Sequence, residues 1–204
     1  MIRIGIVDSG FETREGNSAA FFRDGSRTSG TEPHRLEHGR VIASFIRAEG
    51  VELFSAQVFH DTLGASAGQV ADALAYLAEE EVALIHMSLG LCRDDPAIAR
   101  GCRTYIENGG IIVASTPSMG SAAVYPAAYE GVVRVCADGR CADGQIRLVG
   151  TRPLRYGASP LSSHPQVRGS SVAAARVSGR IARWLAEGLG ADAVRTRLAA
   201  EAQR

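Results

Sequence analysis

The sequence predicts an α/β fold of three layers, with a mostly parallel central sheet and helices on both faces. Two observations support this prediction. Short apolar runs alternate along the chain with segments that have helical periodicity. Two of these runs, residues 82–85 and 111–114, are apolar throughout, as expected for strands that are buried on both faces.

The expected elements follow from these patterns, in chain order. Strands are expected at 2–7, 52–59, 82–87, 111–115 and 131–137. Helices are expected at 39–48, 67–80, 96–108, Ser171–Glu187 and Ala191–Ala202, with Gly188 and Gly190 separating the last two. Residues 9–35 are polar and rich in Gly and Ser, which predicts a long surface loop. A second irregular stretch is expected at about 150–168.

Length and composition are those of one well-buried domain over residues 1–204, because 46% of the residues are hydrophobic and no repeat or linker is visible. The formal net charge is zero, so no long-range field favours nucleic acid or an anionic membrane. No signal peptide and no apolar run of about 20 residues is present, so we expect a cytoplasmic protein that is not embedded in a membrane.

The four cysteines, Cys92, Cys102, Cys136 and Cys141, lack the paired spacing of a zinc site. Cys136 and Cys141 flank Asp138-Gly139, a hairpin-turn signal that could place them across two strands. Free, partly buried thiols are the favoured interpretation, and we expect neither a metal nor another cofactor.

Three polar residues stand where a parallel sheet would place a site. Asp8 ends the first strand, His38 begins a helix, and Ser171 begins the longest helix. Each has a simpler explanation: Asp8 as a metal ligand or helix cap, His38 as a surface or capping residue, and Ser171 as an N-cap. Together, an aspartate, a histidine and a serine are also the set that activates a serine nucleophile.

The flanking residues resemble the motifs of the subtilase family of serine proteases. Asp8-Ser9-Gly10 resembles the family's Asp-(Ser/Thr)-Gly, and residues 38–43 resemble His-Gly-x-x-(Val/Ile)-Ala. Residues 169–174 resemble Gly-Thr-Ser-x-Ala-Ala. Between them, residues 85–90 resemble Ile-Asn-Met-Ser-Leu-Gly, residues 110–114 resemble the strand before the oxyanion region, and 125–127 match Tyr-Pro-Ala. The resemblance covers residues 1 to about 187.

The resemblance implies a subtilisin-like fold and a serine endopeptidase with Asp8, His38 and Ser171 as catalytic residues. It implies further that Ser88, Leu89 and Gly90 form one wall of the substrate groove, and Ala114 and Ser115 part of the other. Thr116, where the family often has Ala, would narrow the primary specificity pocket and favour small or unbranched substrate residues.

The chain departs from the family where an oxyanion donor is expected. The family reads Ala-Ala-Gly-Asn, whereas this chain reads Ser115-Thr116-Pro117-Ser118. Ser118 stands at the Asn position with a shorter side chain, so Ser118 and Thr116 are the candidate replacement donors.

Two functional interpretations remain open. The first is an endopeptidase that acts on a peptide or protein substrate, and whose task is the maturation of a specific precursor peptide. The second is a catalytically weak or inactive module that binds an extended peptide or a partner subunit. A receiver-like or dehydrogenase fold is disfavoured, because no GxGxxG follows the first strand and His38 and Ser171 would be unexplained.

Overall fold

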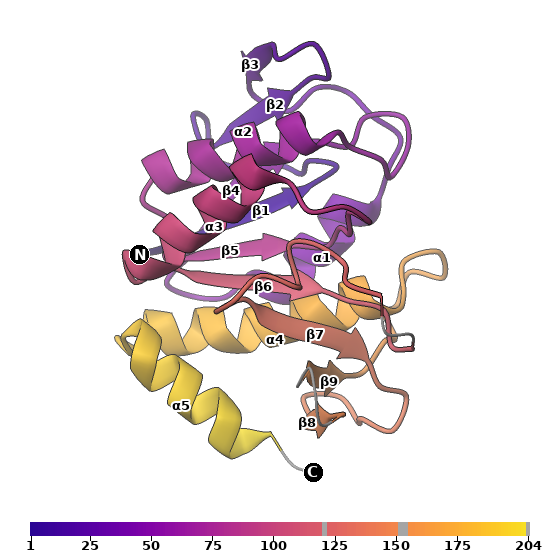
Figure 1. The fold of residues 1–204 in the computed structure, drawn as a ribbon, viewed down its shortest axis with the longest axis vertical. Helices are drawn as coiled ribbons and strands as arrows, with labels where there is room; N and C mark the ends of the chain where they lie inside the picture. Colours follow the sequence, from indigo (N-terminus) through magenta and orange to yellow (C-terminus); the bar gives the residue numbers. More distant parts are fainter. Residues whose placement is uncertain (120–121, 151–154, 203–204) are drawn as a thin grey trace.

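The computed structural model describes residues 1–119, 122–150 and 155–202 (Figure 1). The strands are β1 (Ile2–Asp8), β2 (Ser18–Phe21), β3 (Arg27–Ser29), β4 (Val51–Gln57), β5 (Leu84–Met87), β6 (Ile111–Ser115), β7 (Val133–Ala137), β8 (Ile146–Val149) and β9 (Arg155–Ala158). The helices are α1 (His38–Ile46), α2 (Ala67–Glu79), α3 (Pro96–Glu107), α4 (Ser170–Ala186) and α5 (Ala191–Glu201). All the strands and helices expected from the sequence are present, with ends that differ by at most two residues.

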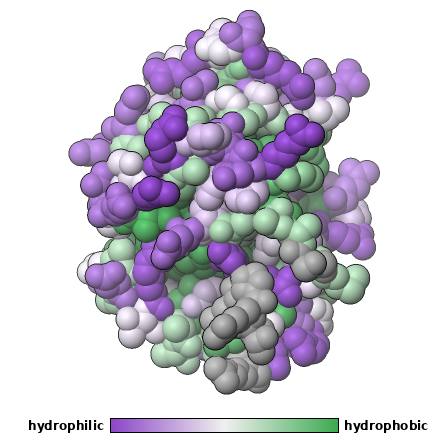
Figure 2. Space-filling view, viewed as in Figure 1, coloured by the Kyte–Doolittle hydropathy of each residue, from purple (hydrophilic) through white to green (hydrophobic). Residues whose placement is uncertain are grey.

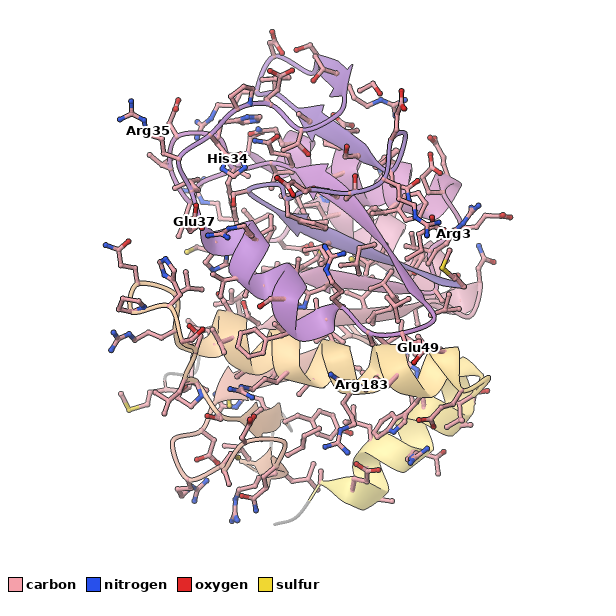
Figure 3. All side chains as sticks on the ribbon, turned by 180° about the vertical axis from the view of Figure 1, so that it is seen from behind. Arg3, His34, Arg35, Glu37, Glu49 and Arg183 are labelled. Atoms are coloured by element: carbon pink, nitrogen blue, oxygen red, sulfur yellow. The ribbon has the colours of Figure 1, made fainter. Side chains whose placement is uncertain are left out.

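The strands form one sheet in the order β3-β2-β4-β1-β5-β6-β7-β9-β8. Every pairing from β2 to β9 in this order is parallel, and only the outermost strands, β3 and β8, pair antiparallel to their neighbours. Helices α2 and α3 cover one face of the sheet, while α1 and α4 cover the other (Figures 1 and 3). The predicted three-layer α/β class is therefore confirmed, and the arrangement is a subtilisin-like fold.

The sheet separates two hydrophobic cores, and β6 shows how one strand contributes to both. Ile111 and Val113 pack in the core under α1 and α4, whereas Ile112 and Ala114 pack in the core under α2 and α3. Because successive side chains of a strand point to opposite faces, a strand with a helical layer on each side is apolar at every position.

Two segments expected to be irregular contribute strands to the sheet. Residues 9–35 contain β2, which adds to β4 in parallel, and β3, which closes that edge of the sheet. Within 150–168, β9 pairs with β7. These predictions were wrong because both parallel strands are only four residues long, too short for a clear apolar pattern.

Hydrophilic residues predominate over the face that α2 and α3 cover (Figure 2). In the described part of the chain, no helix is long and apolar enough to cross a membrane. All four cysteines are free; Cys102, Cys136 and Cys141 are buried, and Cys92 is exposed.

The carboxyl ends of the parallel strands meet at one edge of the sheet, at the right of Figure 1. Helices α1 and α4 both begin at this edge, so their amino-terminal residues lie beside the ends of β1 and β5. Ligand sites of open α/β sheets form at this kind of edge.

Candidate active site

Asp8 and His38 form a hydrogen-bonded pair at the carboxyl edge of the sheet. Asp8 is the last residue of β1 and is fully buried, whereas His38 is the first residue of α1 and its side chain is 11% exposed. The Nδ1 atom of His38 lies 2.8 Å from Oδ1 and 2.9 Å from Oδ2 of Asp8. A carboxylate in this position fixes the Nδ1–H tautomer of the imidazole and leaves Nε2 free to accept a proton.

The residues around this pair explain why the chain brings them together. The backbone N–H of Ser9 donates to Asp8 Oδ1 at 2.7 Å, and the backbone N–H of Gly39 donates to Ser9 Oγ at 2.9 Å. Gly39 has no room for a side chain, because a Cβ atom there would lie 2.6 Å from the carbonyl oxygen of Gly10. The start of α1 is thus joined directly to the turn that follows β1.

Two opposing effects set the protonation of His38. Burial disfavours the charged imidazolium, but the hydrogen bond and the negative charge of Asp8 outweigh burial and raise the pKa of His38 above 6.5. The imidazolium form is therefore stabilised, as required of a group that accepts a proton during a reaction.

Ser171 lies in the first turn of α4, after Gly169, whose φ of 93° favours glycine. Its carbonyl oxygen accepts a hydrogen bond from Ser88 Oγ at 3.4 Å, which places it beside the end of β5, the neighbour of β1. The Ser171 hydroxyl has no hydrogen-bond partner among the residues that the structure describes, and no hydrogen bond joins it to His38.

The expected substrate-binding residues occupy the ends of two adjacent strands. Met87, the last residue of β5, pairs with Ala114, so Ser88 to Gly90 leave the sheet beside Ser115, the last residue of β6. Gly90 is exposed, and a Cβ atom there would lie 2.5 Å from Val124 Cγ1. Leu89, Ala114 and Ser115 are buried.

The segment expected to supply oxyanion donors is directed toward β7 instead. The Ser118 hydroxyl donates to the carbonyl of Ala137 at 2.8 Å, so its hydrogen is not free to donate to a reacting oxygen in this arrangement. The backbone N–H of Thr116 donates to Val135. The guanidinium of Arg155 holds the segment by donating to the carbonyls of Pro117 and Ser118, at 2.9 and 3.4 Å. The oxyanion roles of Thr116 and Ser118 stay predictions.

Sequence reasoning missed one polar residue, His86, which is fully buried in β5. Its Nδ1 lies 2.8 Å from Ser178 Oγ and its Nε2 lies 2.6 Å from Ser88 Oγ. Burial, with a smaller effect from His38, lowers the pKa of His86 to about 3. The available signal was the motif at 85–90, which has His where the subtilase pattern has Asn.

In the described ranges, His, Cys, Asp and Glu side chains form no cluster of three that could hold a metal ion.

Several solved proteases share this fold. A psychrophilic protease matches with a TM-score of 0.76 and 21% identity, covering 97% of this chain and 81% of its own. Sphericase matches with a TM-score of 0.74 and 19% identity, covering 97% and 81%. A lanthipeptide protease matches with a TM-score of 0.69 and 17% identity, covering 96% and 78%. Neither a known family profile nor a curated protein sequence matches the chain.

Proposed function

We propose that this protein is a serine endopeptidase that uses Asp8, His38 and Ser171. The observation that carries the proposal is the buried hydrogen bond between Asp8 and His38 at the carboxyl edge of a subtilisin-like sheet. An aspartate that orients a histidine in this way prepares the histidine to take the proton of an adjacent serine hydroxyl. The position of Ser171 beside β5, at the start of α4, supports its role as that serine.

In the proposed reaction, Ser171 Oγ attacks the scissile carbonyl carbon while His38 Nε2 takes the hydroxyl proton. Asp8 stabilises the imidazolium that forms. The carbon–nitrogen bond of the substrate then breaks, and His38 gives its proton to the leaving amine. Water hydrolyses the resulting acyl-enzyme by the same steps, which restores the Ser171 hydroxyl and releases the carboxylic acid.

The developing oxyanion would be stabilised mainly from α4. The backbone N–H of Ser171 belongs to the first turn of this helix, where unpaired N–H groups and the positive end of the helix dipole favour negative charge. Ser118 contributes a donor only if its hydroxyl leaves Ala137. We therefore propose that hydrolysis by the protein alone is slow.

The proposed substrate is an extended peptide that lies between Ser88-Leu89-Gly90 on one side and Ala114-Ser115 on the other. Ser88-Leu89-Gly90 directly follows β5, and Ala114-Ser115 forms the end of β6, so an extended substrate can lie beside these strand ends and pair with backbone groups there in the manner of an added strand. A lanthipeptide protease is among the structural neighbours, and this supports cleavage of a specific precursor peptide.

A binding module without proteolytic activity is the second candidate. Two observations favour it: Ser118 is hydrogen-bonded to β7, and the Ser171 hydroxyl makes no hydrogen bond to His38. Such a protein would hold an extended peptide or a partner subunit in the same groove without cutting it.

A fluorophosphonate probe distinguishes the two functions, because it reacts covalently with an activated serine. Labelling of the wild-type protein, with loss of labelling in both Ser171→Ala and His38→Ala, is the expected result. Ser44→Ala is the matched control, since it removes an exposed serine hydroxyl that donates to the Val41 carbonyl on its own helix and should retain labelling. A correctly folded wild-type protein that is not labelled would contradict the protease and support the binding module.

A further inference from the structure

His86 sits in a buried chain of hydrogen bonds that crosses from α4 to β5 and returns to α4. Its two ring nitrogens contact hydroxyls on opposite sides, Ser178 Oγ at 2.8 Å and Ser88 Oγ at 2.6 Å. Ser88 Oγ in turn lies 3.4 Å from the carbonyl oxygen of Ser171. This series of hydrogen bonds begins at Ser178 in the third turn of α4 and ends in the first turn, at the proposed nucleophile Ser171.

With a neutral His86 ring, only one arrangement of hydrogens makes all three contacts hydrogen bonds. The carbonyl of Ser171 can only accept, so Ser88 must donate its single hydroxyl hydrogen there. Ser88 then has to accept from His86, which places the hydrogen of the neutral ring on Nε2. The unprotonated Nδ1 accepts from Ser178. In the Nδ1–H tautomer, the Ser88 hydroxyl would have to donate its hydrogen to Nε2 of His86, and the carbonyl of Ser171 would lose its hydrogen bond.

The first turn of α4 is thereby held from two strands. Ser170 Oγ accepts a hydrogen bond from the backbone N–H of Ala137, the last residue of β7, at 3.1 Å. Ser88, the residue that follows β5, holds the Ser171 carbonyl. Gly169, which precedes both serines, gives this turn little stiffness of its own.

We propose that His86, in its Nε2–H tautomer, is a positioning residue that acts through Ser88 to fix the backbone of Ser171 for attack. The proposal rests on the proposed protease function and names a residue that does not touch the substrate. A displacement of about 1 Å at a nucleophile can cost on the order of 100-fold in rate, so a buried link to its backbone has a measurable effect.

A neutral group suits this position because His38 must become positively charged during the reaction. His86 and His38 are close enough to interact electrostatically, and a cation at His86 would oppose that charge. A fully buried imidazole remains uncharged near neutral pH while still offering one donor and one acceptor.

Two substitutions of His86 remove its two hydrogen bonds one at a time. In His86→Gln, the amide reaches the former Nε2 position and can still donate to Ser88, while the contact with Ser178 is lost. In His86→Asn, the amide reaches the former Nδ1 position and keeps Ser178, while the contact with Ser88 is lost. Each variant loses one of the two buried hydrogen bonds of His86, so the pair shows which of the two bonds the activity depends on.

The expected result is a fall in kcat of about 10- to 100-fold for His86→Asn with little change in KM, and a fall of no more than about threefold for His86→Gln. The rate of fluorophosphonate labelling should fall in the same order. If kcat falls equally in the two variants, or falls only as far as the melting temperature of each variant falls, His86 has a purely structural role and the proposal is overturned. Unchanged activity in His86→Asn would also overturn it.

Nitrogen-15 NMR of the histidine rings tests the hydrogen-bond chain without any activity. A protonated Nε2 and an unprotonated Nδ1 at His86 are expected, and the reverse pattern would overturn the proposal whatever the kinetics show. A wild-type protein that neither cleaves peptides nor reacts with the probe would instead refute the protease function, and NMR alone would then decide whether His86 holds Ser88.

Discussion

Replacement of His86 by asparagine should remove most of the dependence of folding stability on pH in mildly acidic solution. In the folded protein, burial lowers the pKa of His86 to about 3. In the unfolded chain this group is exposed and has an ordinary pKa of about 6.5. Below that value the unfolded state binds one more proton than the folded state, so the free energy of unfolding falls as the pH falls.

The expected slope is about 1.4 kcal/mol per pH unit, or about 2 kcal/mol between about pH 6 and about pH 4.5. The titration of His38 changes the free energy of unfolding in the opposite direction, and it does so at higher pH. Its folded pKa lies above 6.5, so its stabilising contribution is complete below that value and is lost as the pH rises through the folded pKa. Carboxyl groups with a lowered pKa contribute only below about pH 5, so most of this window reports the titration of His86.

Urea denaturation at several pH values in this window measures the slope. Tyr105→Phe is the matched control, because it removes a buried hydrogen bond to the Val82 carbonyl without changing a group that titrates here. The control should be less stable at every pH but keep the wild-type slope. If His86→Asn shows the same slope as the wild type, the buried neutral state of His86 is refuted.

Three further predictions concern the proposed active site. The kcat/KM of peptide hydrolysis should rise with pH through a value above 6.5, because His38 must lose its proton before it can act as a base; an acid limb well below that value in a pH–rate profile would contradict this. Gly39→Ala should lower the free energy of unfolding by about 1–3 kcal/mol, because the new Cβ would lie 2.6 Å from the carbonyl of Gly10, and an unchanged urea midpoint would refute the close contact. Ser118→Asn should raise kcat by up to ~100-fold by supplying an amide donor to the oxyanion, and no gain over a wild type of ordinary subtilase activity would show that the site is complete without it.

The sequence was sufficient to predict the central strands and their helices because both faces of this sheet are covered. Strands such as β6 are then apolar at every position, and this pattern is visible without any partner. The strands next to the two edges of the sheet were missed, because β2 and β9 depend on pairing with β4 and β7 rather than on their own four residues.

In the site, too, residues were predicted where neighbouring positions in the sequence mark them, and missed where their role depends on residues far away along the chain. Asp8 and His38 were identified because their motifs include the glycines that let the two segments meet, and Gly39 has no space for any side chain. His86 carries no comparable local signal, since its role depends on Ser178, which lies 92 positions away along the chain. A buried histidine in an apolar strand is costly unless both ring nitrogens are satisfied. That cost directs attention to His86, and only the folded arrangement shows that the hydroxyls satisfying it lead to Ser171.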